Sequence, residues 1–368
     1  MNYKNKKILI IHDRFMFRGG AERLVLDMAC GLKADIATGF WDDEQSFPRE
    51  RVPHKLYVLG KLIEIPGIRY LYLLFLFLFK TDFVKSYDVI IFSGNNCLVT
   101  ANRVPKGVSK IFYCHSPVRH VYDLKDHYLS NKPWWKREIL RMLIFGSKIV
   151  YNFNFRKMDL VITNSQNTRG RLLKYLNTDA RVIYPPIQTN KFTWRGQKDY
   201  YLTVGRVDRL KRISDVVRAF QQMPDKKLII PSSGDDMENV KQMARGHDNI
   251  SVVGWVSDDN LQDLVGNCIA TFYVPLNEDS GMAQLEGMAA GKPCISVDEG
   301  GMKESVIDDI TGFMVSSDYG TEDLIEATKR MTSDKAFSMK QDCINMAQKF
   351  NYERFVEEMK EVIYDHRN

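Results

Sequence analysis

The sequence lacks the patterns that mark disulfide-rich and metal-binding proteins. Its 368 residues include only six cysteines, at positions 30, 97, 114, 268, 294 and 343. Their spacing fits neither a disulfide framework nor a zinc site, so we expect reduced thiols of the kind found in cytosolic proteins. Pairs of adjacent aspartates occur at 42–43, 235–236, 258–259 and 308–309. None of them has neighbours that suggest a metal site, so we expect no bound metal and no cofactor.

Apolar runs long enough to cross a membrane are missing too. The run at residues 70–79 has ten residues, whereas a spanning helix needs about 20. The basic N-terminal stretch leads into an apolar run of only four residues, 8–11, which predicts a first strand and not a signal peptide. Residues 133–157 contain two tryptophans and alternate basic with apolar side chains. With 70–79 they would form an interfacial helix pair on an anionic membrane, or else one buried and one surface helix.

Strong charge of either sign is absent. The net charge is +6 at pH 7, and 44% of the residues are hydrophobic and 27% charged. This composition is typical of a globular protein that binds anionic substrates, and it does not predict a nucleic-acid partner. We expect a cytoplasmic protein, either free or at the inner face of the cytoplasmic membrane.

Short apolar runs alternate with amphipathic stretches along the whole chain. The runs lie at 7–13, 87–94, 110–116 and 159–165, and again at 200–207, 226–234, 250–256, 268–275 and 292–297. This alternation predicts an α/β protein with two Rossmann-like, doubly wound domains that face each other across a cleft. We expect the first domain at 1–186, the second at 187–349, and a closing amphipathic helix at 350–368. Pro185 and Pro186 interrupt the pattern and suggest a linker.

The segment 277–293 combines two glutamates with helix start and stop signals. Asp279 or Ser280 would cap the helix, and Gly291 followed by Pro293 would end it. The first amides of such a helix have no partner within it and attract anions. Here they would belong to Gly281, Met282 and Ala283, with Glu278 in front and Glu286 reaching back. The pattern fits a ligand with a diphosphate and flanking hydroxyls, as in a nucleotide sugar; a capped surface helix is the alternative.

Further candidates follow other apolar runs. Arg206 and Lys211, in the loop after 200–204, would supply a guanidinium and an ammonium for a diphosphate, or else belong to a solvated face. Gly19 and Gly20 open a helix and would offer a second set of amides, although they lack the GxGxxG spacing of a dinucleotide site. His115 lies at a predicted strand end, and Arg119 four residues later would contact an acceptor or position the loop.

Together these motifs resemble the family-4 retaining glycosyltransferases of the GT-B fold. The matching stretches are GGAERL, YCHSPVRHVYD, VITNSQNTRGRL, VIYPPIQTNKF, VGRVDRLKR, VVGWVSDDNLQDL and YVPLNEDSGMAQLEGMAAGKPCISVDEGGMKESV, in family order. The stretch CHSPVRHVYD is similar to the mannosyltransferase branch that builds bacterial surface polysaccharides, including lipopolysaccharide. Ser280 and Gly287 depart from that branch, in which Phe and Ala are usual.

The resemblance implies a role for each matching position. Arg206 and Lys211 would hold the donor diphosphate, Glu286 the ribose, and Glu278 the hydroxyls of the transferred sugar. His115 would stand beside the sugar ring, and Arg119 would contact the acceptor. Further donor contacts would come from Gly19, Gly20, Gly254, Val256, Ser280, Gly281, Met282 and Ala283. The closing helix would cross back to the first domain.

The expected activity is a metal-independent, retaining transfer of a hexose to an acceptor hydroxyl. The donor is a GDP- or UDP-linked sugar with mannose favoured, and the acceptor a lipid-linked or polysaccharide glycan. Two alternatives stay open: a non-catalytic sugar-nucleotide-binding subunit of a glycosyltransferase complex, and a sugar-nucleotide epimerase on the same fold. Nothing in the sequence supports a phosphorylase.

Overall fold

Two compact units divide the chain. A computed structural model describes residues 6–63, 65–130 and 133–365. The first unit ends at Tyr184 and resumes at Phe355, and the second extends from Pro185 to Arg354. The first crossing falls at the Pro185–Pro186 pair, and the second falls inside helix α13 (Tyr352–Asp365).

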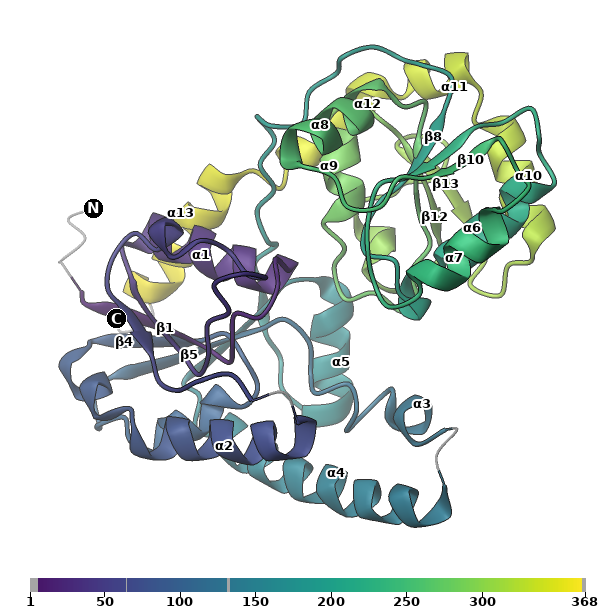
Figure 1. The fold of residues 1–368 in the computed structure, drawn as a ribbon. Coiled ribbons are helices and arrows are strands. Elements are labelled where there is room, and N and C mark those ends of the chain that lie inside the picture. The colour runs from purple at the N-terminus through teal and green to yellow at the C-terminus, as the bar shows by residue number, and fades with distance from the viewer. Residues whose placement is uncertain (1–5, 64, 131–132, 366–368) are drawn as a thin grey trace. The chain divides into compact units, whose positions relative to one another are not determined.

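The first unit contains a parallel sheet of seven strands in the order β3-β2-β1-β4-β5-β6-β7 (Figure 1). The strands are β1 (Ile8–His12), β2 (Asp35–Thr38), β3 (Leu56–Val58), β4 (Val89–Phe92), β5 (Ser109–Cys114), β6 (Leu160–Thr163) and β7 (Arg181–Val182). Its helices are α1 (Gly20–Leu32), α2 (Pro66–Phe79), α3 (Lys125–Leu129), α4 (Trp134–Phe155), α5 (Gln166–Leu176) and most of α13. The strand order reverses between β1 and β4, as in a doubly wound sheet.

Helices cover both faces of this sheet. All residues of β1 and β4 are buried, as expected for strands packed on two sides. On β5, Phe112 packs against Phe155 of α4 while its neighbour Tyr113 packs against Phe355 of α13. Because adjacent strand residues point to opposite faces, α4 and α13 lie on opposite sides of the sheet.

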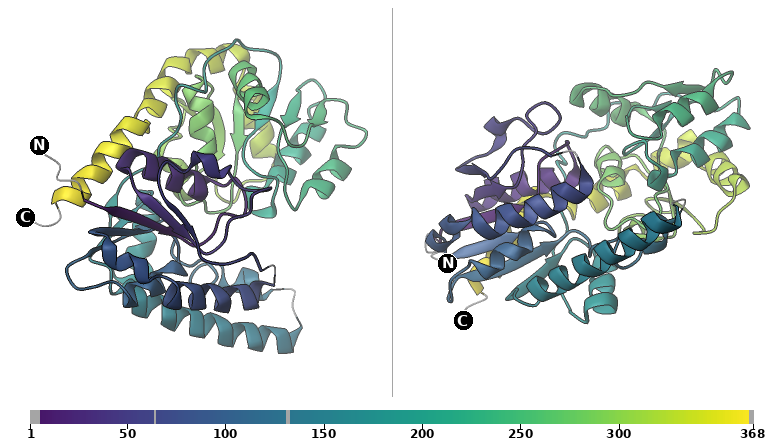
Figure 2. Two further views of the ribbon diagram at one scale, coloured as in Figure 1. Left: turned by 60° about the vertical axis from the view of Figure 1, so that its left-hand side comes forward. Right: turned by 60° about the horizontal axis from the view of Figure 1, so that its bottom comes forward.

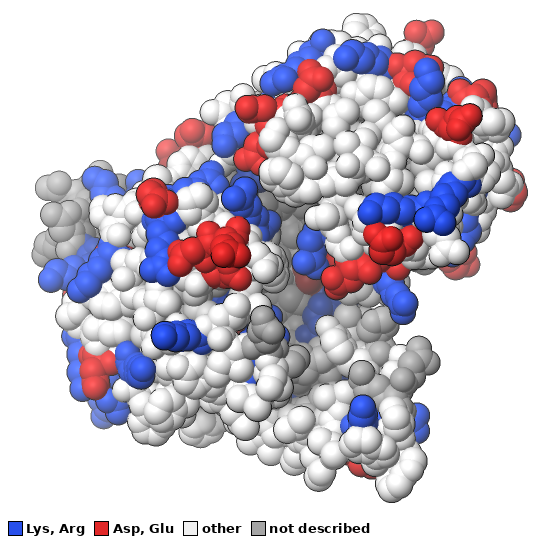
Figure 3. All heavy atoms as spheres, in the orientation of Figure 1, with Lys and Arg blue, Asp and Glu red and all other residues white. Residues whose placement is uncertain are grey.

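Helices α2 and α4 carry apolar side chains on the outside as well as the inside. Both pack against the short helix η3 (Cys97–Asn102), and Figures 1 and 2 show them running alongside each other. Their exposed apolar residues are Ile68, Leu71, Phe75 and Phe79 on α2 and Trp134, Trp135, Ile139, Met142, Leu143, Phe145, Ile149 and Phe153 on α4. In the view of Figure 3 few charged side chains lie over these helices. No described helix is both long and apolar enough to cross a membrane.

The second unit contains a six-stranded parallel sheet in the order β10-β9-β8-β11-β12-β13. Its strands are β8 (Tyr201–Thr203), β9 (Leu228–Ile230), β10 (Ile250–Val252), β11 (Thr271–Tyr273), β12 (Cys294–Val297) and β13 (Gly312–Val315). Its helices are α6 (Ile213–Gln221), α7 (Met237–Ala244), α8 (Asp258–Asn267), α9 (Ala283–Ala289), α10 (Thr321–Arg330), α11 (Ser333–Ser338) and α12 (Lys340–Gln348). Tyr201, Phe220 and Phe272 pack edge to face and join β8, β11 and α6.

Candidate functional site

In the second unit the predicted residues gather where the strand order reverses. That point lies between the neighbouring strands β8 and β11, and in doubly wound sheets ligands bind outside the carboxyl ends of such strands. Arg206 and Lys211 follow β8, and Glu278 follows β11. The pairing of two strands far apart in the sequence therefore brings their loops together.

Lys211 is the centre of this site. Its Nζ donates hydrogen bonds to Glu278 Oε2 at 2.6 Å and to the Tyr273 hydroxyl at 2.9 Å. Burial alone would lower the pKa of Lys211, but Tyr273 and Glu278 outweigh that effect and raise its pKa above the ordinary value. Lys211 is therefore a largely buried, charged ammonium, and among the described residues two of its three donors are used, which leaves one N–H for a ligand.

Arg212 joins the two loops beside this pair. Its Nε donates to Val274 O at 2.9 Å, and its Nη2 donates to Pro275 O and to Glu299 Oε2, both at 2.8 Å. Its backbone is left-handed, with φ of 52°, a conformation that costs a residue with a side chain about 1–2 kcal/mol. Three charge-assisted hydrogen bonds offset that cost. Arg212 thus holds the Glu278 loop against the Lys211 loop.

Arg206 is placed differently from Lys211. Its side chain is 61% exposed, and its Nη2 lies 3.3 Å from Asp208 Oδ2. The other oxygen of Asp208 accepts hydrogen bonds from the amides of Leu210 and Lys211. Asp208 therefore shapes the loop, and Arg206 is a solvent-facing guanidinium five residues before Lys211 in the same loop.

The predicted helix cap at Asp279 or Ser280 is wrong. Helix α9 begins at Ala283, and its N-cap position is Met282, which makes no side-chain capping bond. Gly281 has φ of +66°, outside the helical region, and the Gln284 side-chain amide donates to Gly281 O at 3.0 Å. This left-handed turn delays the helix, so Ser280, Gly281 and Met282 form a loop ahead of it.

The remaining predicted donor residues lie at the same edge of the sheet. Glu286 is in the first turn of α9, where its amide makes a hydrogen bond to Met282 O. Gly254, with φ of +82°, and Val256 follow β10, two strands away from β8. The structure thus joins Lys211 directly to Glu278 and places Gly254 and Val256 further along the edge.

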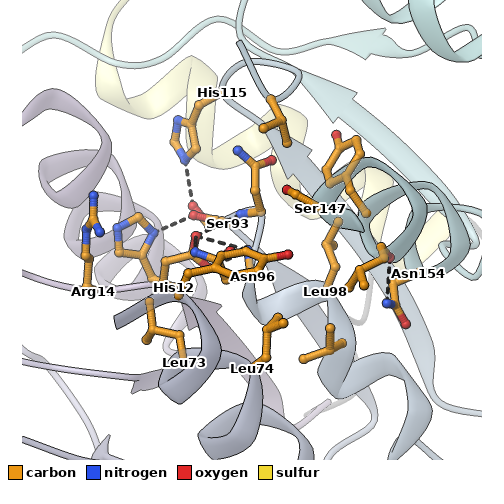
Figure 4. Close-up of a pocket in the computed structure, with 18 of the residues that line it drawn as sticks. His12, Arg14, Leu73, Leu74, Ser93, Asn96, Leu98, His115, Ser147 and Asn154 are labelled. Carbon is orange, nitrogen blue, oxygen red and sulfur yellow. Dashed lines mark hydrogen bonds between the residues drawn. The ribbon is translucent and has the colours of Figure 1, made fainter. Parts of the chain in front are cut away.

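The first unit has a cavity at its own reversal point. It has a volume of about 390 Å³ and is lined by residues from the ends of β1, β4 and β5 and from α2 and α4. His12, Ser93 and His115 lie together at the strand ends (Figure 4). The Ser93 hydroxyl lies 2.7 Å from His115 Nε2, and the Ser93 carbonyl accepts a hydrogen bond from His12 Nδ1.

The two histidines differ in their proton affinity. Burial and the neighbouring His12 lower the pKa of His115 to about 3, so His115 is a neutral imidazole. Burial would lower the pKa of His12 as well, but Glu22, Asp13 and the Ser93 carbonyl raise it. His115 can therefore donate or accept a hydrogen bond without carrying charge.

The other predicted residues of the first unit lie in or beside this cavity. Arg119 lines it and binds Asp123 through Nε at 3.3 Å, while its buried Nη2 has no hydrogen-bond partner among the described residues. Gly19 caps α1 and Gly20 is its first residue. A Cβ atom at Gly19 would meet the end of the Glu22 side chain, which lines the cavity, and the Phe17 ring, so a larger residue here would displace Glu22.

Sequence reasoning missed several residues of both sites. His12 and Asp13 directly follow an apolar run, the same signal that singled out His115, and could have been found in this way. Tyr273 and Arg212 could not, because their roles depend on the pairing of β8 with β11. Among the described residues, no three of His, Cys, Asp and Glu lie close enough together to hold a metal ion.

Comparison with known families covers both units. Residues 18–191 match the family described as Glycosyltransferase Family 4, and residues 186–350 match Glycosyl transferases group 1. The chain is a family-4 glycosyltransferase. The predicted family and reaction class are thereby confirmed.

Curated relatives of this glycosyltransferase match it over nearly its whole length. The alpha-1,3/1,6-mannosyltransferase ALG2 of Dictyostelium discoideum is 24% identical, with 98% of both chains covered. The human protein of the same name is 26% identical, with 93% of this chain and 92% of the relative covered.

Solved structures confirm the predicted GT-B fold. The sucrose-phosphate synthase of Thermosynechococcus elongatus superposes with a TM-score of 0.80 at 19% identity, over 98% of this chain and 99% of the other. Anabaena HepE in complex with UDP-glucose superposes with a TM-score of 0.74 at 16% identity, over 97% of this chain and 99% of the other. These likenesses establish the fold.

Proposed function

We propose that this glycosyltransferase moves mannose, with retention of configuration, from a nucleoside-diphosphate mannose to a hydroxyl group of a lipid-linked glycan. The mannosyltransferase relatives, which match the chain from end to end, support the choice of sugar. The observation that carries the proposal is the contact of Lys211 with Glu278 at 2.6 Å, at the reversal point of the second sheet.

Lys211 and Arg206 stabilise the departing diphosphate. As the bond to the sugar breaks, negative charge grows on the phosphate oxygens, and fixed cations lower the barrier. Lys211 is already largely buried and oriented by Tyr273, so it needs little reorganisation, whereas Arg206 moves from solvent onto the phosphates. In this scheme the two cations supply the positive charge that a metal ion provides in other transferases, and the reaction needs no metal.

Glu278 orients the sugar and does not attack it. Its carboxylate pairs with Lys211 in the structure, and in this scheme it binds hydroxyls of the sugar once Lys211 turns to the phosphate. The acceptor hydroxyl therefore approaches the same face of the sugar that the diphosphate leaves. Its proton passes to the leaving phosphate oxygen as the C–O bond to the acceptor forms, so configuration is retained without an enzyme base.

The outer surface of α2 and α4 contacts the membrane in this proposal. Their exposed apolar side chains lie beside Lys136, Arg137 and Lys148 of α4, which suits an anionic lipid surface. A peripheral contact of this kind would bring the enzyme to a lipid-linked acceptor.

A transfer assay tests the proposed reaction. The purified chain is incubated with GDP- or UDP-linked mannose and a panel of lipid-linked saccharides, and products are analysed by mass spectrometry and NMR. We expect an α-linked mannoside from the α-linked donor. Lys211→Met should lower kcat/KM about 30- to 150-fold, since one charge-assisted contact is worth about 2–3 kcal/mol. Lys241→Met, which removes an exposed lysine paired with Glu238, is the matched control.

Other outcomes would favour the rival functions. Tight donor binding without transfer or donor hydrolysis indicates a non-catalytic subunit. A changed sugar on the nucleotide in the absence of acceptor indicates an epimerase.

A vesicle assay tests the membrane contact. Phe75→Ser and Phe145→Ser should each weaken binding to anionic vesicles about tenfold, because each removes a ring worth about 1.5–3 kcal/mol when fully buried. Leu173→Ser, an exposed apolar residue of α5, serves as the control. Equal binding by all three variants would rule out this surface.

A further inference from the structure

Tyr273 has a hydroxyl proton that makes no hydrogen bond within the described part of the chain. The side chain lies at the end of β11 and is 5% exposed, and its oxygen accepts a hydrogen bond from Lys211 Nζ at 2.9 Å. An ammonium has donors only, so this contact uses a lone pair of the phenol and leaves its O–H unused. Because a buried donor without an acceptor costs free energy, we expect its partner to come from a ligand.

The two least exposed tyrosines among the described residues show the usual arrangement. Tyr113 donates to Ile183 O at 2.7 Å, and Tyr201 donates to Met331 O at 2.8 Å. Each of these phenols is therefore satisfied by a main-chain carbonyl of the fold. The unused O–H of Tyr273 instead lies beside the ion pair of the donor site, where ligands of doubly wound sheets bind.

The strands on either side hold the ring of Tyr273 in place. Its carbonyl accepts a hydrogen bond from Ser296 Oγ of β12 at 2.6 Å. On the other side Gly205 follows β8 with φ of +93°, and a Cβ atom there would lie 2.9 Å from Tyr273 Cε2. The absence of a side chain at Gly205 thus leaves room for the ring beside Lys211. The hydroxyl is ordered before any ligand binds, so its hydrogen bond costs little further entropy.

The phenol of Tyr273 also keeps its proton. Burial is the largest effect on its pKa and raises it, and the carboxylate of Glu278 raises it further, whereas Lys211 lowers it. The balance leaves the pKa of Tyr273 above its ordinary value. The site therefore contains a neutral O–H donor next to an ammonium donor, an arrangement suited to an anion with several oxygens.

We infer that the Tyr273 hydroxyl donates a hydrogen bond to the diphosphate of the sugar donor and is a further catalytic residue of this glycosyltransferase. Neighbouring oxygens of a diphosphate lie close together, so one accepts from Lys211 and the next from Tyr273. As the bond to the sugar breaks, negative charge grows on these oxygens and the hydrogen bond from Tyr273 strengthens. The inference rests on the proposed function and adds a neutral donor to its two cations.

Calorimetry with GDP and UDP tests whether Tyr273 acts directly or only through Lys211. Tyr273→Phe should bind the nucleotide about ten- to a hundredfold more weakly. In the Lys211→Met background the same change should still weaken binding about fivefold or more; no further loss there would mean that Tyr273 only orients Lys211, and would overturn the inference. Tyr201→Phe is the matched control, because its hydroxyl already has an acceptor. It should leave the Kd unchanged, and a loss equal to that of Tyr273→Phe would also overturn the inference.

Replacement of Tyr273 by 3-fluorotyrosine gives a second test, in which the two roles predict different results. Fluorine keeps the ring and makes the hydroxyl a stronger donor and a weaker acceptor. The bond from Lys211 is present before the nucleotide binds, so the change in Kd reports the bond that forms on binding. We expect the fluorinated protein to bind about two- to fivefold more tightly. Unchanged or weaker binding, with unaltered Tm, overturns the inference.

Failure of this inference and failure of the proposed function can be told apart, because the titrations involve no transfer. A wild-type chain that transfers mannose but whose Tyr273 variants bind GDP and UDP normally refutes the role of Tyr273 alone. A chain that binds these nucleotides through Tyr273 yet transfers no sugar refutes the proposed reaction alone. A wild-type chain that binds neither nucleotide overturns the inference whatever the transfer assay shows.

Discussion

Replacing Glu278 by glutamine should strengthen the binding of a free nucleoside diphosphate while it impairs sugar transfer. Lys211 is paired with Glu278 at 2.6 Å, so an incoming diphosphate meets a carboxylate already next to its cation. Glutamine keeps the shape and a hydrogen-bond acceptor but removes the negative charge. Glu278 competes with the diphosphate for Lys211 and also orients the sugar. Its replacement should therefore strengthen diphosphate binding and slow sugar transfer.

The magnitude follows from the geometry of the pair. At 2.6 Å and an effective dielectric constant of about 20, the direct attraction is about 6 kcal/mol. Desolvation of two groups that are mostly buried offsets much of it, which leaves on the order of 1–3 kcal/mol. Glu278→Gln should therefore lower the Kd of GDP or UDP about 5- to 150-fold.

Isothermal titration calorimetry and the transfer assay measure the two effects on the same samples. The nucleoside diphosphate should bind Glu278→Gln more tightly than the wild type, and kcat with the complete donor should fall. When Lys211→Met is present, the further change Glu278→Gln should no longer alter the binding of the diphosphate. Weaker binding of the diphosphate to Glu278→Gln alone would refute the idea that Lys211 exchanges Glu278 for phosphate.

Three further predictions concern residues around the two sites. Arg212→Gln should lower the free energy of unfolding of the second unit by about 2–3 kcal/mol and reduce kcat/KM. Arg209→Gln, which changes an exposed arginine of the same loop, should do neither. Equal Tm values for the two variants would contradict the linking role of Arg212. His115→Gln should reduce kcat/KM without moving the acid limb of the pH profile, because the pKa of His115 is already lowered to about 3; an acid limb near pH 6.5 that disappears in the variant would oppose this. Burial lowers the pKa of Lys292 from 10.5 to about 8. Between these two pH values the unfolded chain binds one more proton than the folded chain, so the free energy of unfolding should rise with pH. Lys292→Met should remove this part of the rise in Tm, and an identical rise in both proteins would show that Lys292 does not cause it.

The long apolar strands and their order along the chain were predictable from the sequence. β1, β4 and β5 contain more consecutive apolar residues than a surface segment normally does, and polar residues mark their ends. Strands β2, β3, β7 and β13 were not predicted from the apolar runs of the sequence. Each of them is a strand because it pairs along the backbone with a neighbouring strand: β2 with β1 and β3, β7 with β6, and β13 with β12.

The site was predictable in its residue types but not in its contacts. Lys211 and Glu278 stand out as charged residues that follow strands, yet only the pairing of β8 with β11 brings them together. The preference of Asp and Ser for helix N-caps placed the predicted start of α9 too early. The left-handed turn at Gly281 and the hydrogen bond from the Gln284 side chain to Gly281 O override that preference. The individual donor contacts of Glu286, Gly254 and Val256 remain predictions.

The most direct test of the account is the anomeric configuration and Lys211 dependence of the transferred sugar. With an α-linked nucleoside-diphosphate mannose and a lipid-linked acceptor, the account predicts an α-mannoside whose rate of formation falls about 30-fold or more in Lys211→Met. A β-mannoside, or an α-mannoside formed equally fast by Lys211→Met, would contradict it.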